Sequence, residues 1–405
     1  MIWLVWLKNT LKIVLALGLV LPFSCQSQNL KENIQPIVAA QDLDQYLPML
    51  RGKQIGLVAN QTSVVFGAGS SNDKYVHLAD TLVALGIELK KVFAPEHGFR
   101  GTADAGAAVS DGIDPKTGLP IISLYGANKK PRVEDLHDVN LIVFDIQDVG
   151  SRFYTYLSTL HYVMEACAEQ NIPIIVLDRP NPNGHYIDGP VLDQKFKSFV
   201  GLHPVPVVYG MTIGEYAQMI NGELWLANKH QAELTVIPLS QYTHKTPYSL
   251  PIPPSPNLRS DQAIALYPSL CLFEGTPISA GRGTDRPFEL FGAPYFDTVN
   301  YSYTFRPVAR PGAMWPKFKD QNCQGLDLGS ADPPDRMDLS WLINAYNEAP
   351  NPQDFFNNFF DKLAGTDQLK KKIIRGLSAE EIRQGWTKEL SDFKQIRARY
   401  LIYEE

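Results

Sequence analysis

The 405-residue sequence predicts an α/β protein, with a mostly parallel sheet domain followed by a smaller α+β domain. Three observations predict this. The chain is too long for one ordinary core. Near-continuous apolar runs alternate with helical stretches between residues 54 and 238, which is typical of parallel strands covered on both faces. From about residue 285, aromatic and proline-rich segments replace this alternation.

The elements of the first domain follow in order. A helix is expected to begin at Thr212, where Thr-Ile-Gly-Glu fits a capping box with Glu215 reaching back. The expected strands are 54–59, 89–94, 121–125, 141–145, 174–178 and 234–238, and the expected helices between them include 74–85 and 157–170.

The second domain is expected to close the chain with helices at 339–347, 352–363 and 380–400. We place the sheet domain at 37–288 and the smaller domain at 289–405. No internal repeat or low-complexity segment is visible.

The N-terminus reads as a targeting segment. Lys8 and Lys12 precede an apolar run at 13–21, which predicts a signal peptide over 1–24 and a polar leader over 25–36. The run is too short to favour a transmembrane anchor. Cys25 is a candidate lipidation site, with simple cleavage near 26–28 as the alternative. We therefore expect an exported protein, either periplasmic or a lipoprotein whose membrane attachment would depend only on a lipid at Cys25.

Composition disfavours several classes of function. The formal net charge is −6 and no long basic run occurs, which argues against a nucleic-acid partner. Cys167, Cys271 and Cys323 are scattered, so we expect buried thiols rather than a metal site or a disulfide framework. No dinucleotide fingerprint, Walker A motif or Gly-x-Ser-x-Gly elbow is present, so we expect no cofactor and no α/β-hydrolase esterase.

Polar residues follow several of the predicted strands. Ligands of open parallel sheets bind beyond the carboxyl ends of the strands, so these side chains are expected to converge on one site. They are Asn60 after the first strand, Glu96, His97 and Arg100 after the second, Asp145, Asp148 and Arg152 after the fourth, and Asp178 after the fifth.

Glu96 is the sharpest catalytic candidate. Phe93 and Phe99 flank it, and desolvation by them would raise its pKa and favour a protonated acid. The alternative is a loop brace in which Glu96 pairs with Arg100. His97 could orient Glu96, bind substrate or donate a structural hydrogen bond.

A second dense cluster lies at 273–289. Small residues there expose backbone amides around Glu274, while Arg282 and Arg286 carry guanidinium forks suited to a carboxylate. An interdomain hinge braced by ion pairs is the alternative. Aromatic residues that suit a sugar ring lie near these loops, namely Tyr125, Tyr154, Tyr156, Tyr209, Phe273 and Phe291.

Four motifs together resemble the NamZ-type exo-β-N-acetylmuramidases over roughly residues 37–405. The motifs are PEHGFRG at 95–101, FDIQDVGSRFYTY at 144–156, LDRPNPNG at 177–184 and EGTPISAGRGTDRPFE at 274–289. The resemblance implies a Rossmann-like domain joined to an auxiliary domain, with the active site in the cleft between them. It implies exo-hydrolysis of a non-reducing terminal β-N-acetylmuramic acid from N-acetylglucosamine-linked peptidoglycan fragments, with the catalytic glutamate of the first motif at Glu96.

Glycoside cleavage usually needs a second carboxylate, for which we rank Asp145 first, then Glu274, then Asp148. The 2-acetamido group of the substrate could instead supply the nucleophile, with the carboxylate orienting it. The lactyl carboxylate of muramic acid needs a cation, which Arg152, Arg282 or Arg286 would supply. The residues expected to contact the sugar are Asn60, His97, Arg100, Asp148, Arg152, Tyr156, Asp178, Arg282 and Arg286.

Two other functions compete with this one. A non-catalytic cell-wall glycan-binding lipoprotein would use the same cleft without releasing sugar. A nucleotide-dependent enzyme would need a phosphate-binding loop after the first strand, and the segment at 59–63 contains no glycine.

Overall fold

The computed structural model describes residues 35–66, 75–101 and 111–405. The predicted signal peptide, Cys25 and most of the predicted leader lie outside these ranges. Residues 35–405 form a single compact unit.

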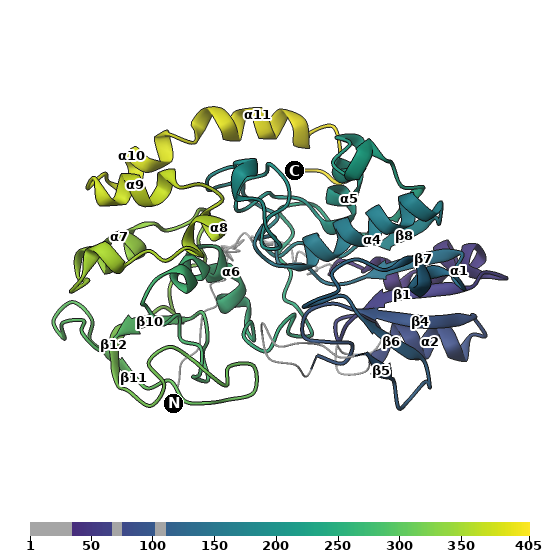
Figure 1. Ribbon diagram of the computed structural model, residues 1–405, viewed down its shortest axis with the longest axis horizontal. Coiled ribbons are helices and arrows are strands. Elements are labelled where there is room, and N and C mark those ends of the chain that lie inside the picture. Colours follow the sequence, from purple (N-terminus) through teal and green to yellow (C-terminus); the bar gives the residue numbers. More distant parts are fainter. Residues whose placement is uncertain (1–34, 67–74, 102–110) are drawn as a thin grey trace, which may run out of the picture. The chain divides into compact units, whose positions relative to one another are not determined.

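A seven-stranded sheet organises the first part of this unit (Figure 1). All neighbouring strands are parallel except the edge pair β5 and β6. In spatial order the strands are β5 (Gly112–Ile113), β6 (Pro120–Ser123), β4 (Leu89–Ala94), β1 (Ile55–Ala59), β7 (Leu141–Asp145), β8 (Ile174–Leu177) and β9 (Leu234–Ile237).

The order of the parallel strands is that of a Rossmann fold. From β1 the chain builds outward through β4 and β6, and it then crosses back to build β7, β8 and β9 on the other side. The direction in which successive strands are added to the sheet reverses around β1. The carboxyl ends of β4 and β7 therefore flank the crevice in which ligands of such sheets bind. The predicted α/β class with a mostly parallel sheet is confirmed.

Helices cover both faces of the sheet. On one face α1 (Leu43–Leu50) and α2 (Leu78–Ala84) pack against alternate apolar residues of β1 and β7. On the other face α4 (Tyr156–Gln170) and α5 (Ile213–Gly222) pack against the strand residues whose side chains point to that face. Gly56 of β1 lies on this second face, where a Cβ atom would come within 2.6 Å of the Ile142 side chain.

The second part of the unit is built on a small antiparallel sheet. Its strands, in spatial order, are β10 (Leu290–Ala293), β12 (Cys323–Asp327) and β11 (Tyr303–Phe305). Its helices are α7 (Ser340–Asn347), α8 (Phe360–Ala364), α9 (Gln368–Ile374), α10 (Ala379–Gln384) and α11 (Thr387–Arg397). The remaining elements are β2 (Val64–Phe66), β3 (Tyr75–His77), α3 (Val133–Leu136), α6 (Asp261–Leu270) and the 3₁₀ turns η1 (Ala39–Gln41), η2 (Gln194–Phe196), η3 (Ala227–Lys229), η4 (Cys271–Gly275) and η5 (Pro352–Asp354).

The two parts share one hydrophobic core, which runs from the α4 face of the sheet through α6 to α7, α8 and α9. The chain then returns along α11 to the first part, as Figure 1 shows. There the Arg397 guanidinium donates to the Gly210 carbonyl, and the Tyr403 hydroxyl donates to Asp178 at 2.6 Å. The shared core and the returning C-terminal segment both cross the domain boundary that is expected at residue 288. That boundary therefore stays a prediction.

Most of the expected elements are present, with shifts at their ends. The strands at 89–94 and 141–145 match their predicted bounds, and Thr212 and Glu215 form the predicted capping box. The helix expected at 74–85 is shorter, because residues 75–77 pair with β2 as strand β3. The helix expected at 352–363 is a 3₁₀ turn followed by α8.

The three later cysteines are free and buried, as predicted. Within the ranges that the structure describes, no helix has both the length and the apolar character needed to span a bilayer.

Candidate active site

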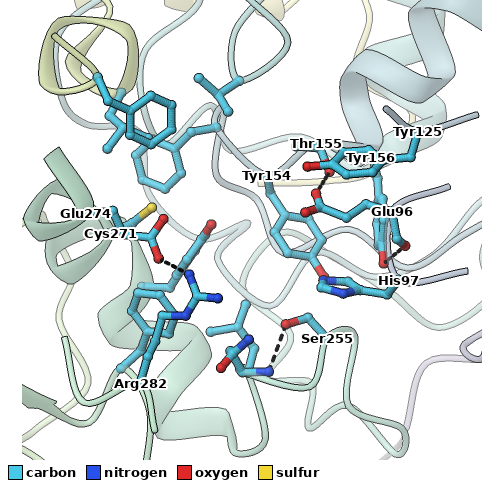
Figure 2. Close-up of a pocket in the computed structure, with 18 residues that line it drawn as sticks. Glu96, His97, Tyr125, Tyr154, Thr155, Tyr156, Ser255, Cys271, Glu274 and Arg282 are labelled. Carbon is cyan, nitrogen blue, oxygen red and sulfur yellow. Dashed lines mark hydrogen bonds and ion pairs between the residues drawn. The ribbon is translucent and has the colours of Figure 1, made fainter. Parts of the chain in front are cut away.

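A pocket of about 220 Å³ opens where the carboxyl ends of β4 and β6 face the second part of the unit (Figure 2). One wall comes from the loops after β4 and β6 and from the start of α4. The opposite wall comes from α6, η4 and the loop before β10. The residues that line it are Glu96, His97, Tyr125, Phe153, Tyr154, Thr155, Tyr156, Val200, Ser255, Asn257, Leu258, Tyr267, Cys271, Glu274, Arg282, Phe288, Phe359 and Leu363.

Glu96 is half-buried on the first wall. The Thr155 hydroxyl donates a 2.7 Å hydrogen bond to Oε2 of Glu96. Thr155 is the N-cap residue of α4, so the first turn of a long buried helix fixes the orientation of the carboxyl group.

The turn that carries Glu96 has an unusual backbone. His97 adopts a φ of 70°, in the left-handed region that residues with a Cβ seldom occupy. Gly101 ends the turn at a φ of 74°, where a Cβ would lie 2.6 Å from the Gln61 side chain. Such backbone conformations persist where the surroundings enforce them, often at functional sites.

Tyrosine side chains fix the loop that closes the pocket. The hydroxyls of Tyr154 and Tyr156 both donate to the Pro254 carbonyl, at 2.9 and 3.1 Å. The next residues of that loop, Ser255 and Asn257, line the pocket and are joined by a 3.0 Å hydrogen bond.

On the opposite wall, Arg282 donates to Glu274 at 2.8 Å and to the Gly312 carbonyl at 3.3 Å. Behind this pair, the Lys317 ammonium donates to the carbonyls of Phe273 at 2.7 Å and Glu274 at 3.2 Å. Burial lowers the pKa of Lys317 to about 8, an effect that the nearby Glu274 carboxylate opposes.

The two carboxylates influence the same aromatic side chains. Burial raises the pKa of Tyr125, and the Glu96 carboxylate raises it further. Burial also raises the pKa of Tyr267 well above its usual value, with contributions from both Glu274 and Glu96. Figure 2 shows Glu96 on one wall, facing Glu274 and Arg282 on the other. An acid and an ion pair thus face one aromatic-lined cavity, an arrangement suited to hydrolysing a polar ring compound.

Five of the residues predicted for the site do line this pocket: Glu96, His97, Tyr156, Glu274 and Arg282. The three strand-end aspartates do not. Asp145 accepts 2.6 and 2.9 Å bonds from Arg179 and is fully buried. Asp148 accepts from the Tyr209 hydroxyl and from the Gly150 amide, and Asp178 accepts from Thr212 and Tyr403.

Two of the predicted arginines and Asn60 also lie outside the pocket lining. Arg100 pairs with Asp114 at 2.8 Å, which also argues against the alternative of a brace between Arg100 and Glu96. Arg286 pairs with Asp327 and with Glu289. The side-chain oxygen of Asn60 accepts from the Thr62 amide, closing a tight turn after β1.

Arg152 lies outside the pocket lining as well. Its guanidinium is buried and donates to the carbonyls of Pro190 and Val205 at 2.7 Å. It also donates to the carbonyls of Leu363 and Ala364 at the end of α8. Four backbone carbonyls therefore accept from the two terminal nitrogens of the guanidinium that was expected to bind substrate.

Sequence reasoning missed several pocket residues. Thr155 lies inside a motif that was singled out, but its role depends on where α4 begins. Ser255 and Asn257 belong to a proline-rich loop, and the run of prolines before a helix was the available signal. Of the aromatic candidates, Tyr125, Tyr154 and Tyr156 line the pocket, whereas Tyr209, Phe273 and Phe291 do not. No group of three or more His, Cys, Asp or Glu side chains suited to a metal ion occurs within 35–66, 75–101 and 111–405.

Family models match nearly the whole described unit. Residues 55–262 match the N-terminal part of the exo-β-N-acetylmuramidase NamZ, and residues 265–403 match the C-terminal part. The chain belongs to the NamZ family. It is 41% identical to the peptidoglycan β-N-acetylmuramidase NamZ of Bacillus subtilis (strain 168) over 381 residues, which cover 89% of each protein.

Two solved structures, both of DUF1343 family proteins from Bacteroides fragilis, share the fold. One superposes with a TM-score of 0.82 at 43% identity and the other with a TM-score of 0.76 at 29% identity. Each comparison covers 92% of this chain and all of the other. The fold described above is therefore shared with two proteins of known crystal structure.

Proposed function

We propose that this NamZ-family glycoside hydrolase releases non-reducing terminal β-N-acetylmuramic acid from peptidoglycan fragments such as MurNAc-GlcNAc, with Glu96 as the general acid. The B. subtilis relative is a peptidoglycan β-N-acetylmuramidase. One observation carries the residue assignment: Glu96 and the Glu274–Arg282 pair line opposite walls of the same pocket.

A general acid must present its proton to the glycosidic oxygen in a fixed direction. The Thr155 hydroxyl binds Oε2 of Glu96, and Tyr156 lies beside the same residue with its hydroxyl 3.5 Å from the Glu96 carbonyl. These contacts support Glu96 as the group that protonates the leaving sugar.

Glu274 is our choice for the second carboxylate. It lines the pocket with Glu96, whereas Asp145 and Asp148 are engaged by Arg179 and Tyr209 away from it. Glu274 can act directly on the anomeric centre. It can also hold the 2-acetamido group while that group attacks, because substrate-assisted glycosidases need a carboxylate in that role.

Arg282 is our choice for the cation that recognises the lactyl carboxylate. Its hydrogen bonds to Glu274 and to the Gly312 carbonyl use two of the five N–H groups that a guanidinium carries. Its side chain is 28% exposed in the pocket wall, so it can take a second carboxylate.

Such a substrate lies outside the cytoplasmic membrane, which agrees with the proposed signal peptide at 1–24. We propose that the protein is exported to the periplasm, or is held at the membrane by a lipid on Cys25.

Replacing Glu96 with glutamine tests the assignment. E96Q keeps the shape of the side chain but cannot donate an acidic proton, so kcat on MurNAc-GlcNAc should fall by at least about 100-fold. Exposed Glu389 provides the control substitution E389Q. Released sugar is followed by mass. Near-wild-type turnover by E96Q would refute the acid role, and glycan binding without release by the wild type would favour the glycan-binding lipoprotein.

A further inference from the structure

A tryptophan projects from the loop beside the pocket. Trp315 is 86% exposed, although indole side chains usually bury most of their surface. Met314 before it is 47% exposed. An aromatic ring so exposed, on a loop whose neighbouring residues contact the pocket wall, is a candidate contact for a ligand.

The segment that precedes Trp315 is fixed to the pocket wall. The Gly312 carbonyl accepts from Asn257 at 2.7 Å and from Arg282 at 3.3 Å, and both donors line the pocket. Gly312 has a φ of 87°, and a Cβ there would come within 2.6 Å of Pro256. Only glycine fits this close approach without strain.

The segment that follows is fixed as well. Pro316 packs so closely on Gly283 that a Cβ at that glycine would lie 2.6 Å from the proline ring. Lys317 then reaches the carbonyls of Phe273 and Glu274 on the pocket wall. Trp315 is therefore the tip of a short loop anchored on both sides, and such preorganisation lowers the entropic cost of binding.

We propose that Trp315 is a stacking platform for a sugar ring of the glycan that extends beyond the terminal residue in the pocket. The C–H groups on one face of a pyranose ring are apolar and complement the electron-rich face of an indole. The Lys319 ammonium lies over the indole ring, 4.5 Å from its centroid, and the residue nevertheless remains 86% exposed. The proposal rests on the proposed function and extends its substrate from a disaccharide to a longer strand.

A lipid surface is the other partner that an exposed tryptophan with a neighbouring lysine would suit. One observation favours the glycan. The loop is bound to Arg282 and Asn257, and both line the pocket that receives the terminal sugar.

The experiment compares a chromogenic muramide with a peptidoglycan tetrasaccharide that ends in N-acetylmuramic acid. Trp315→Ala should raise the ratio of the tetrasaccharide KM to the muramide KM about fivefold or more, and Trp315→Phe should recover much of the loss. Val299→Ala, which alters an 88% exposed apolar residue of the same part of the unit, is the matched control.

A second readout needs no turnover. In the E96Q background, adding tetrasaccharide should change the tryptophan emission, and Trp315→Phe should remove that change. An unchanged KM ratio together with an emission change independent of Trp315 would overturn the platform. Loss of binding of Trp315→Ala to anionic vesicles with unaltered glycan kinetics would also overturn it, in favour of a membrane contact. If the wild type hydrolyses neither substrate, the proposed function fails. The emission change alone then tests whether Trp315 contacts the glycan.

Discussion

The hydroxyl of Thr155 lies 2.7 Å from Oε2 of Glu96 and joins the first turn of α4 to the carboxyl group on the pocket wall. Because α4 is buried over most of its length, it cannot shift without disturbing the core beneath it. Thr155 is thus a positioning residue for the proposed acid.

Substituting Thr155 with valine should lower kcat about tenfold while leaving KM little changed, because one orienting hydrogen bond is lost and the shape is kept. Thr155→Ser should restore most of the rate, since it restores the hydroxyl. Steady-state kinetics on MurNAc-GlcNAc give both constants. A rise in KM at constant kcat, or no rescue by serine, would mean that the threonine serves packing instead.

Arg282 and Arg286 form a matched pair of variants four residues apart. Arg282→Ala should lower kcat/KM for a muramide about 30-fold while costing an N-acetylglucosaminide much less, because a charge-assisted bond to the lactyl carboxylate is lost. Arg286→Ala should leave this discrimination intact, since Arg286 pairs with Asp327 outside the pocket. Equal losses on the two substrates would show that Arg282 only braces Glu274.

Local patterns in the sequence predict the sheet well. The buried strands at 89–94 and 141–145 are continuous apolar runs, and the capping box at Thr212 is a local hydrogen-bond pattern, so each is readable without tertiary contacts. The strand at 75–77 could not be read in this way, because it depends on pairing with β2.

The site was predictable only in part, for a similar physical reason. Glu96 follows β4 and points into the crevice as the switch-point rule suggests. Asp145 follows β7 at the same edge, yet its oxygens are taken by Arg179, which is distant in sequence. Sequence places a polar residue at a strand end but does not say which other buried residue will pair with it.

Asp148 gives a prediction about pH. Burial raises its pKa to about 6, although hydrogen bonds from Tyr209 and Gly150 oppose the shift. The folded state therefore holds this proton more tightly than the unfolded chain, whose aspartates titrate near pH 4. The resulting contribution to stability is present below about pH 4 and is lost as the pH rises through about 6, by up to about 3 kcal/mol.

Asp148→Asn has no proton to lose, so wild type should become less stable relative to this variant as the pH is raised from about 4 to about 6.5. Urea unfolding at several pH values measures the difference between the two free energies of unfolding. Asp332→Asn, at an exposed loop position, is the control. A difference between wild type and Asp148→Asn that does not vary with pH would contradict a raised pKa at Asp148.

Arg152 was expected to bind the substrate carboxylate, and its surroundings give it a different role. Its guanidinium joins the carbonyls of Pro190 and Val205 to those of Leu363 and Ala364, so one buried side chain ties the sheet domain to the end of α8. Arg152→Met fills similar space but leaves these carbonyls without a donor, which should lower the free energy of unfolding by about 3 kcal/mol or more. Arg152→Lys should not restore it, because an ammonium cannot reproduce the planar fork. Urea unfolding measures the loss, and the folded fraction should still prefer a muramide to a glucosaminide. A variant that stays stably folded but has lost this preference would indicate that Arg152 binds the substrate carboxylate.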